Sequence, residues 1–275
     1  MTLDPRVTPA RDDLASRALE GLVSAKAYAD PRAMTAIVPA AALRRAADPW
    51  SEQVDQVLFG EVFDVLEAAD GYAWGQARRD GYVGFVETGA LAPAGPAPSH
   101  RVSAIRTYAF AEPSIKSRAL GPYSINSLVA VEAREGRFAK AASSGWFIEA
   151  HLAPVGVFET DPVAVAERFL GAPYLWGGRE SLGVDCSGLV QQALLACGKA
   201  FPRDTDQQEA AGEAVERLAR GDLVFWTGHV AMMLDETRII HANAFHMATA
   251  VEPLAEARAR YVANGVGEPT AYRRP

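Results

Sequence analysis

The pattern of hydrophobic and polar positions changes several times along the 275 residues of the chain. Over residues 12–29, apolar side chains recur three and four positions apart, and this spacing predicts a short amphipathic helix. We therefore expect residues 1–30 to form an N-terminal helical segment.

The pattern then turns to short β-prone runs separated by turns. The runs cover residues 57–60, 62–66, 72–77 and 82–86. Between them, Asp70-Gly71 and Asp80-Gly81 are signals for hairpin turns. Short strands at this spacing are typical of a small barrel, which we place at residues 31–92.

A second β-rich stretch follows a proline-rich segment. Residues 91–99 are predicted to be a linker, and further β-prone runs lie at 106–110, 128–133 and 138–141. The run that closes this stretch, residues 145–148, is similar to residues 81–86, which indicates a weak internal repeat. We therefore expect a second barrel at residues 99–156.

The helical period returns after Asp161-Pro162. One helix is predicted at residues 163–170, with proline in its first turn. Another is predicted at residues 186–197, with its apolar residues on one face and Gly198 as its stop. Residues 223–226, 229–234 and 238–242 are predicted strands, so the region from 160 to 275 is predicted to be α+β.

Composition and charge limit the class of partner. A hydrophobic content of 49% excludes a wholly disordered chain, and a net charge of -7 without a basic stripe argues against nucleic acid. Residues 1–6 lack the apolar run of a signal peptide, and no stretch approaches the roughly 20 apolar residues of a membrane span. We expect a cytoplasmic protein with no membrane partner and no cofactor. The sequence indicates no particular oligomeric state.

The chain has two cysteines, Cys186 and Cys197. Joined by one helix, they would lie beyond disulfide reach, which fits a reducing compartment. Cys186 would lie at a helix N-terminus, where free N–H groups and the helix dipole lower a thiol pKa, so we interpret it as a candidate nucleophile. The alternative is a buried structural cysteine. Cys197, on the apolar face at the other helix end, is expected to be a core residue.

Two histidines are candidates for the base. His229 opens one predicted strand and His241 closes the next. In a hairpin centred on Asp235, opposed residue numbers would sum to 470, so the histidines would face each other with Cβ atoms about 5 Å apart. One imidazole could then orient the other. The alternatives are two unrelated strand histidines or half of a metal site; a structural zinc site needs four ligands, and His246 is the residue that could join.

Six short motifs stand out in the C-terminal part of the sequence. They are Tyr174-Leu175-Trp176-Gly177-Gly178, Val184-Asp185-Cys186-Ser187-Gly188-Leu189-Val190, Phe201-Pro202-Arg203-Asp204-Thr205-Asp206-Gln207-Gln208, Gly221-Asp222-Leu223-Val224-Phe225-Trp226, His229-Val230-Ala231-Met232-Met233 and Arg238-Ile239-Ile240-His241-Ala242. Together these motifs resemble the NlpC/P60 cysteine peptidases over residues 160–265. The barrels before them resemble bacterial SH3-type domains, and the combination resembles the γ-D-glutamyl-L-diamino acid endopeptidases that act on murein peptides.

The resemblance implies a catalytic set. Cys186 would attack the γ-D-glutamyl amide carbonyl, His229 would take the thiol proton, and His241 would hold the His229 ring in the useful tautomer. Tyr174, together with the Cys186 backbone N–H, could stabilise the oxyanion. Ordinary aromatic packing is the alternative for Tyr174.

The resemblance also implies substrate contacts. Asp185 would help to bind the free L-Ala amine of an L-Ala-γ-D-Glu-diamino acid peptide, and Ser187 could contribute to the same pocket. The alternative is that both residues cap the following helix, and this is compatible with the substrate contacts. Arg203 could meet a substrate carboxylate or form a structural ion pair. The remaining substrate-binding candidates are Trp176 in the first motif and, from the first barrel, Tyr82 with Glu52 or Glu61.

These features together predict an α+β, papain-like NlpC/P60 catalytic domain at 160–275, preceded by a short N-terminal helix and two small SH3-like barrels. The expected activity is hydrolysis of the γ-D-glutamyl-L-diamino acid bond of murein peptides with a free N-terminal L-Ala, in cell-wall peptide recycling. The alternatives are an amidase or acyltransferase on the same scaffold, or a protein that binds cell-wall fragments, because a fold does not determine a substrate.

Overall fold

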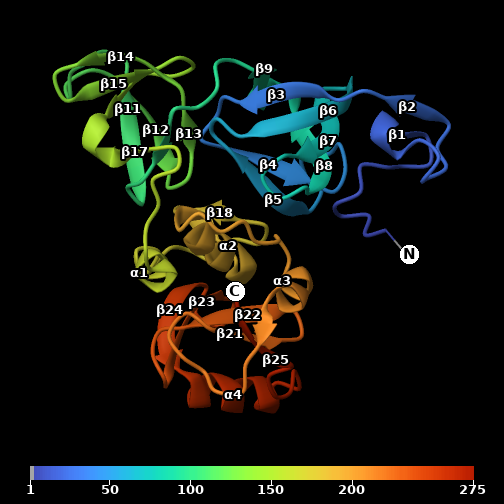
Figure 1. Cartoon of the computed structure of the whole chain (residues 1–275), viewed down its shortest axis with the longest axis vertical. Coiled ribbons are helices and arrows are strands. Elements are labelled where there is room, and N and C mark those ends of the chain that lie inside the picture. Colours follow the sequence, from blue (N-terminus) through green and yellow to red (C-terminus); the bar gives the residue numbers. More distant parts are fainter. Residues whose placement is uncertain (1–2) are drawn as a thin grey trace. The chain divides into compact units, whose positions relative to one another are not determined.

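The computed structural model describes residues 3–275 and divides into two compact units (Figure 1). One unit ends at Val155, and the other comprises Gly156–Pro275. Within the described residues, the helices are all too short or too polar to cross a membrane.

The N-terminal segment is not a helix, so that prediction is wrong. Strand β1 (Leu14–Ser16) pairs in parallel with β2 (Ala27–Ala29), and a 3-10 turn, η1 (Arg17–Leu19), follows β1. Leu22, which a helix would need on its packed face, is 74% exposed, and Gly21 has a φ of +82°. A helix of this length is marginal in water without a packed apolar face, and the segment adopts strands and turns instead.

The first β-rich region forms a sheet with the strand order β5-β4-β8-β7-β6-β3-β9. Its buried core includes Leu43, Val57 and Phe63. Asp70 and Gly71, at φ +51° and +83°, form the predicted hairpin turn between β6 and β7. The elements are β3 (Arg32–Ala36), β4 (Ala40–Arg44), β5 (Gln53–Leu58), β6 (Val62–Ala69), β7 (Tyr72–Ala77), β8 (Val83–Glu87), η2 (Thr88–Ala90) and β9 (Leu91–Pro93).

Part of the expected linker belongs to this sheet. Strand β9 pairs with β3, with Met34 opposite Pro93, so residues 91–93 are strand and the irregular connection begins at residue 94. Proline is compatible with this position because β9 is the last strand of the sheet, where the ladder needs no further donor.

The second β-rich region forms the sheets β12-β11-β16-β15-β14 and β13-β10-β17. Its assignment to the SH3 class stays a prediction. The elements are β10 (His100–Val102), β11 (Arg106–Phe110), β12 (Ala119–Ser124), β13 (Leu128–Val129), β14 (Val131–Glu135), β15 (Phe138–Ala141), β16 (Trp146–Ile148), η3 (Glu149–His151) and β17 (Leu152–Pro154).

Phe59, which directly follows β5, lies in the core of this second region. Its ring centroid is 4.8 Å from that of Tyr123 and 6.3 Å from that of Phe147. Its carbonyl oxygen accepts a hydrogen bond of 2.8 Å from the backbone N–H of Leu128. The two β-rich regions therefore share a core residue.

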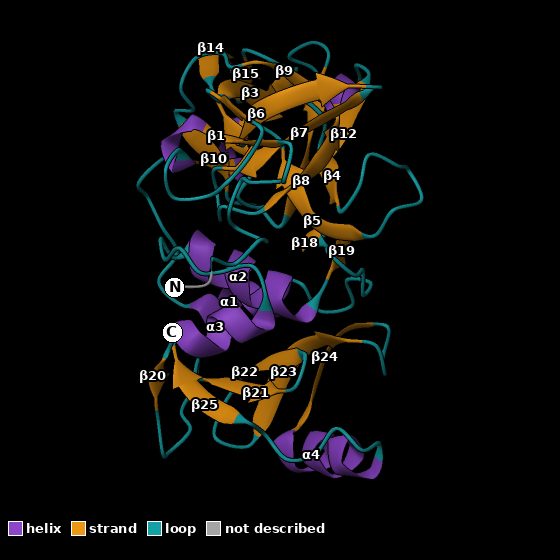
Figure 2. Ribbon diagram, turned by 90° about the vertical axis from the view of Figure 1, so that its right-hand side faces the viewer, coloured by secondary structure: helices purple, strands orange, loops and turns teal. Residues whose placement is uncertain are grey.

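The C-terminal unit combines helices with an antiparallel sheet of order β20-β25-β21-β22-β23-β24. Figure 2 shows α1, α2 and α3 on one face of this sheet and α4 on the other. The elements are α1 (Pro162–Glu167), β18 (Arg179–Glu180), β19 (Gly183–Val184), α2 (Cys186–Ala196), α3 (Thr205–Ala211), β20 (Glu213–Ala214), β21 (Leu223–Trp226), β22 (His229–Met233), β23 (Arg238–Asn243), β24 (Ala248–Pro253), α4 (Leu254–Ala263) and β25 (Ala271–Arg274).

Helix α2 is the central element of this unit. Nearly all of its residues are buried, including Gln191 and Gln192, so the predicted single apolar face is too narrow a description. A Cβ on Gly188 would lie 2.2 Å from the carbonyl oxygen of Gly178, which explains why the first turn carries a glycine. Gly198, at φ +81°, follows the helix as its predicted stop.

Candidate active site

Cys186 is the first residue of α2. The side chain of Asp185 caps this helix, accepting a hydrogen bond of 2.7 Å from the N–H of Gly188. The Cys186 sulfur lies 3.8 Å from the hydroxyl of Thr205, and the residue is 6% exposed. The helix start therefore holds the thiol in a nearly dry position.

The expected lowering of the thiol pKa by the helix terminus is wrong. Burial, with the charge of Asp185 beside it, raises the pKa of the Cys186 thiol to about 11, although hydrogen bonds from the Val230 backbone and Thr205 oppose this rise. Since desolvation outweighs the helix terminus, the resting thiol is protonated at neutral pH. A base must remove its proton for the sulfur to act as a nucleophile.

The predicted histidine pair is present. His229 Nε2 lies 2.8 Å from His241 Nδ1, and both rings are buried. Burial lowers the pKa of His229 well below its usual value, and the neighbouring His241 lowers it further. Burial also lowers the pKa of His241. Both imidazoles are therefore neutral at neutral pH, and His229 can accept a proton.

The register of the two histidine strands differs from the prediction by two residues. Opposed numbers sum to 472, as in Met232 opposite Ile240, so the two histidines are diagonal rather than direct neighbours. The cause is the turn, where the carboxylate of Asp235 accepts hydrogen bonds from the N–H groups of Thr237 and Arg238. This moves the centre of the hairpin one residue beyond Asp235. A shift of two residues in the sum keeps both side chains on one face of the sheet, so the contact survives.

The hydrogen-bonded chain continues beyond the predicted residues. His241 Nε2 lies 2.7 Å from Glu252 Oε1 on β24. Both carboxylate oxygens of Glu252 accept from Arg260 on α4, one at 2.6 Å. Burial opposes the ionisation of Glu252, but hydrogen bonds from Arg260 and His241 outweigh it and lower its pKa to about 2. We call His229, His241, Glu252 and Arg260 the histidine relay.

Two tyrosines border the thiol. Tyr261 on α4 packs its ring 5.4 Å from His229 and 4.8 Å from Trp226. Burial raises the pKa of both Tyr174 and Tyr261, and the nearby Cys186 raises each further. Their hydroxyls therefore keep their protons and can donate. Tyr174 was predicted from the sequence, and Tyr261 was not.

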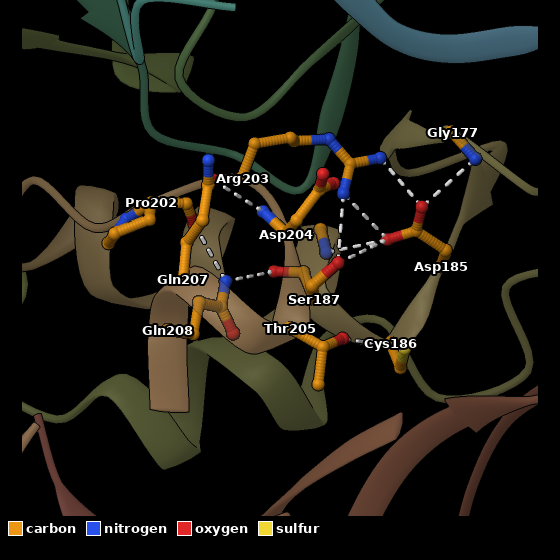
Figure 3. A network of polar contacts seen from close by, with 11 residues as sticks. Gly177, Asp185, Cys186, Ser187, Pro202, Arg203, Asp204, Thr205, Gln207 and Gln208 are labelled. Carbon is orange, nitrogen blue, oxygen red and sulfur yellow. Dashed lines mark hydrogen bonds and ion pairs between the residues drawn. The ribbon is translucent and has the colours of Figure 1, made fainter. Parts of the chain in front are cut away.

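A second polar network surrounds the start of α2 (Figure 3). The Asp185 carboxylate accepts from the N–H of Gly177 at 2.9 Å and from Arg203 at 3.0 and 2.6 Å. Arg203 also donates to the hydroxyl of Ser187 at 2.9 Å, and Gln208 donates to the Ser187 carbonyl oxygen at 3.0 Å. We call Asp185, Ser187 and Arg203 the capping network.

Arg203 takes the structural alternative that the sequence left open. Its side chain is 1% exposed and its guanidinium lies against Asp185 and Ser187, so the expected contact with a substrate carboxylate is not supported. Ser187 and Asp185 are likewise committed to each other and to Arg203. Trp176, by contrast, is 58% exposed.

The barrel candidates lie in the N-terminal unit. Tyr82 belongs to the core cluster of the first barrel. Glu61 is buried, pairs with Arg79 at 2.7 Å and accepts from the Leu58 N–H. Glu52 pairs with Arg45 at 2.8 Å on the surface. Their part in substrate binding stays a prediction.

One group among residues 3–275 has metal-ligand chemistry. Ligand atoms of His241, His246 and Glu252 all lie within 4.8 Å of one another. However, both ring nitrogens of His241 are hydrogen-bonded, and both oxygens of Glu252 accept from the cationic Arg260, which repels a second cation. We therefore assign His241 and Glu252 to the histidine relay.

Glu252 and Arg260 were not predicted from the sequence, which carries only a weak signal for their positions. In residues 248–251, alanine alternates with the β-branched residues threonine and valine, and the run ends at Pro253. An amphipathic stretch follows to residue 263. This pattern is that of a strand followed by a helix. It does not reveal that Glu252 and Arg260 pair, because the pairing depends on how the helix docks.

Comparison with known proteins defines the class. Residues 171–264 match the NlpC/P60 family, and residues 43–91 match the bacterial dipeptidyl-peptidase Sh3 domain. The chain therefore carries an NlpC/P60 domain together with a bacterial SH3 domain, as the motifs predicted. The second β-rich region lies outside both matches.

Individual relatives narrow the comparison. The chain is 38% identical over 89 residues to dipeptidyl-peptidase 6 of Lysinibacillus sphaericus, covering 31% of this chain and 33% of that protein. It is 34% identical over 104 residues to the gamma-D-glutamyl-L-lysine dipeptidyl-peptidase of Bacillus cereus, covering 34% and 31%. The matches thus span about a third of each curated relative. A solved NlpC/P60 family protein from Bacillus cereus, 20% identical, covers 88% of this chain and 99% of its own with a TM-score of 0.76, which shows the same fold.

Proposed function

We propose that this protein is a cysteine endopeptidase that hydrolyses the γ-D-glutamyl bond of peptides derived from peptidoglycan. The observation that carries the proposal is the buried thiol at the start of α2, in the same domain as a neutral imidazole pair whose nitrogens are 2.8 Å apart. The substrate class is supported by the Bacillus cereus relative, which is named a gamma-D-glutamyl-L-lysine dipeptidyl-peptidase.

The proposed reaction has two halves. The Cys186 sulfur attacks the amide carbonyl carbon, and the thiol proton passes to Nδ1 of His229, because His241 holds Nε2. The tetrahedral intermediate collapses, the C–N bond breaks, and the leaving amine takes the proton from His229. Water then attacks the thioester, giving one proton to His229. The C–S bond breaks, and that proton returns to the sulfur.

The charge on the intermediate needs donors. Tyr174 keeps its proton because burial raises its pKa, and its hydroxyl can donate to the oxyanion together with the backbone N–H of Cys186. This uses Tyr174 in the role that the resemblance implied.

The finer part of the proposal concerns the peptide and the place. We infer that the substrate carries a free N-terminal L-Ala and that the reaction serves recycling of murein peptides in the cytoplasm. The amine requirement rests on the motif resemblance, since an ammonium at Asp185 would have to share the carboxylate with Arg203. The reducing compartment is supported by the free thiols of Cys186 and Cys197.

Mass spectrometry of peptide products tests the proposal. The full chain and its Cys186→Ala variant are incubated with L-Ala-γ-D-Glu-diaminopimelate, the L-Lys analogue and N-acetylated copies of both. We expect release of L-Ala-D-Glu from the free peptides and a loss of at least about 10⁴-fold in the variant.

The outcomes separate the alternatives. Equal cleavage of free and acetylated peptides would keep the peptidase and reject the amine requirement. Cleavage retained in Cys186→Ala would reject the nucleophile. If none of the peptides is cut, an amidase or acyltransferase on the same scaffold is the next candidate. Binding of an intact peptide without turnover would instead favour a protein that binds cell-wall fragments.

A further inference from the structure

The far end of the histidine relay consists of a carboxylate and a guanidinium, which reach the histidine pair through His241. We propose that Glu252, held by Arg260, is a positioning residue that sets the direction of every hydrogen bond in the relay and so delivers an unprotonated nitrogen of His229 to the thiol. The inference rests on the proposed function, because it assigns this pair a part in the same reaction.

The direction of each hydrogen bond in the relay follows from what each group can donate. An ionised carboxylate only accepts, so the 2.7 Å contact requires His241 to carry its proton on Nε2. A neutral imidazole has a single N–H, so His241 Nδ1 is then an acceptor. The 2.8 Å contact in turn requires His229 to donate from Nε2. His229 Nδ1 is left with a lone pair, which is the form a general base needs.

The strand register builds this chain by diagonal steps. In the β23–β24 pair, His241 lies opposite Ala250, and Glu252 lies opposite Ile239, so the histidine and the carboxylate are diagonal neighbours. His229 and His241 are related by the same kind of step across β22 and β23. The relay therefore crosses three strands on one face of the sheet, and α4 lies on that face, because its Arg260 contacts Glu252 and its Tyr261 packs against His229.

Arg260 supplies the polarity at the end of the relay. A guanidinium has donors and no acceptor, and here it donates to both oxygens of Glu252. It is itself held in place, with its guanidinium carbon 4.2 Å from the ring centroid of Phe245. The arginine keeps Glu252 ionised, and the relay thus starts from a group that cannot reverse its role.

Replacing Glu252 by glutamine should reverse the direction of the hydrogen bonds in the relay. In Glu252→Gln, Arg260 still only donates, so it takes the amide oxygen and turns the NH₂ group toward His241. The NH₂ group donates to Nε2, His241 moves its proton to Nδ1, and His229 must carry its proton on Nδ1. The base is then blocked although every side chain remains in place. A substitution of this type in a serine protease lowers kcat by about 10⁴-fold, and we expect a loss of about 10³-fold or more here.

Nitrogen-15 NMR of the full chain with labelled histidine reads the tautomers directly. The chain has five histidines, so the spectrum is simple, and His241→Gln assigns the relay signals. We expect the Nε2–H form for both His229 and His241 in the unaltered protein and in Glu252→Asp, and the Nδ1–H form for both in Glu252→Gln. Unchanged tautomers in Glu252→Gln would overturn the proposal.

The matched control is Asp222→Asn. Asp222 is also a buried carboxylate held by two nitrogens of one arginine, Arg274, at 2.8 and 2.9 Å, but its other hydrogen bond comes from the backbone N–H of Ala219 and not from a histidine. We expect its loss to leave the tautomers of His229 and His241 unchanged. A reversal in Asp222→Asn would show that the tautomers follow general destabilisation and would reject the specific role of Glu252.

Activity supplies the second readout. We expect Glu252→Gln to lower kcat with little change in KM, and Glu252→Asp to recover most of the rate. A recovered rate in Glu252→Gln with reversed tautomers would reject the link to catalysis. If the unaltered protein cuts no γ-D-glutamyl peptide, the proposed function fails, yet the NMR result still decides whether Glu252 sets the tautomers.

Discussion

Two of the carboxylate–arginine pairs in the C-terminal unit differ in their third partner, and this partner separates their roles. Asp185, paired with Arg203, also accepts from the backbone N–H groups of Gly177 and Gly188. Glu252, paired with Arg260, instead meets the imidazole of His241. In the proposed reaction, the first pair fixes the backbone that presents Cys186, and the second fixes the protons of the histidine pair. The same ion-pair chemistry therefore serves geometry in one place and proton direction in the other.

The two pairs also differ in burial. The Arg203 side chain is 1% exposed, whereas that of Arg260 is 17% exposed and reaches the surface beside Phe245. Breaking the deeper pair should cost folding free energy, and breaking the shallower one should chiefly cost catalysis.

The largest expected effect on stability comes from Arg203→Met. The variant leaves the Asp185 carboxylate buried without its cation, and breaking a buried pair in this way costs about 3–5 kcal/mol. Urea unfolding of the full chain, followed by fluorescence and circular dichroism, measures the loss. The histidine tautomers of the folded variant should stay as they are in the unaltered protein.

Arg274→Met provides the comparison for this measurement. Arg274 is 53% exposed beside Asp222, so water can partly replace it and its removal should cost less free energy of unfolding than the removal of Arg203. If both variants lose the same free energy, the capping network has no special part in stability. The double variant Asp185→Asn with Arg203→Met should recover part of the loss, because it removes the unpaired charge.

A smaller effect is expected from Tyr174→Phe, which alters neither pair. Removing one oxyanion donor should lower kcat by about 10²-fold and leave KM within about twofold. Steady-state kinetics on the γ-D-glutamyl peptide measures both. An unchanged kcat would return Tyr174 to ordinary aromatic packing.

The smallest effect is the change in the reactivity of the Cys186 thiol for each unit of pH. Because the pKa of Cys186 is raised to about 11, its thiolate fraction should rise about tenfold per pH unit between pH 7 and 10. Alkylation by iodoacetamide, followed for the Cys186 peptide by mass spectrometry, should rise in the same way. A rate that is constant from pH 6 to 8 would instead indicate a resting thiolate–imidazolium pair.

The sequence predicted the parts of the site that local patterns encode. Periodicity predicts helix α2 and the strands β21, β22 and β23, and the motifs indicate Cys186 and His229. The predicted register of β22 and β23 was wrong by two residues because the Asp235 side chain shapes the turn between them. Counting residues from a hairpin centre does not reveal such a side-chain contact. The N-terminal helix failed because apolar spacing does not guarantee a surface to pack against.

The relay end shows the other limit of sequence reasoning. Glu252 lies 11 residues beyond His241 and eight before Arg260, so no single helix or strand brings the three together. Their meeting depends on the pairing of β23 with β24 and on the docking of α4. Fold-level packing, rather than local preference, creates this part of the site.

The position of Phe59 determines where this protein can be divided into fragments. Phe59 follows a strand of the first β-rich region, yet its ring packs against Tyr123 and Phe147 in the second. A fragment that stops in the connection at residue 94 would leave a large aromatic ring in water, and a fragment that begins there would lack a central piece of its core. The two regions should therefore be transferred together in a chimaera, and a chimaera made from the first region alone should be poorly soluble.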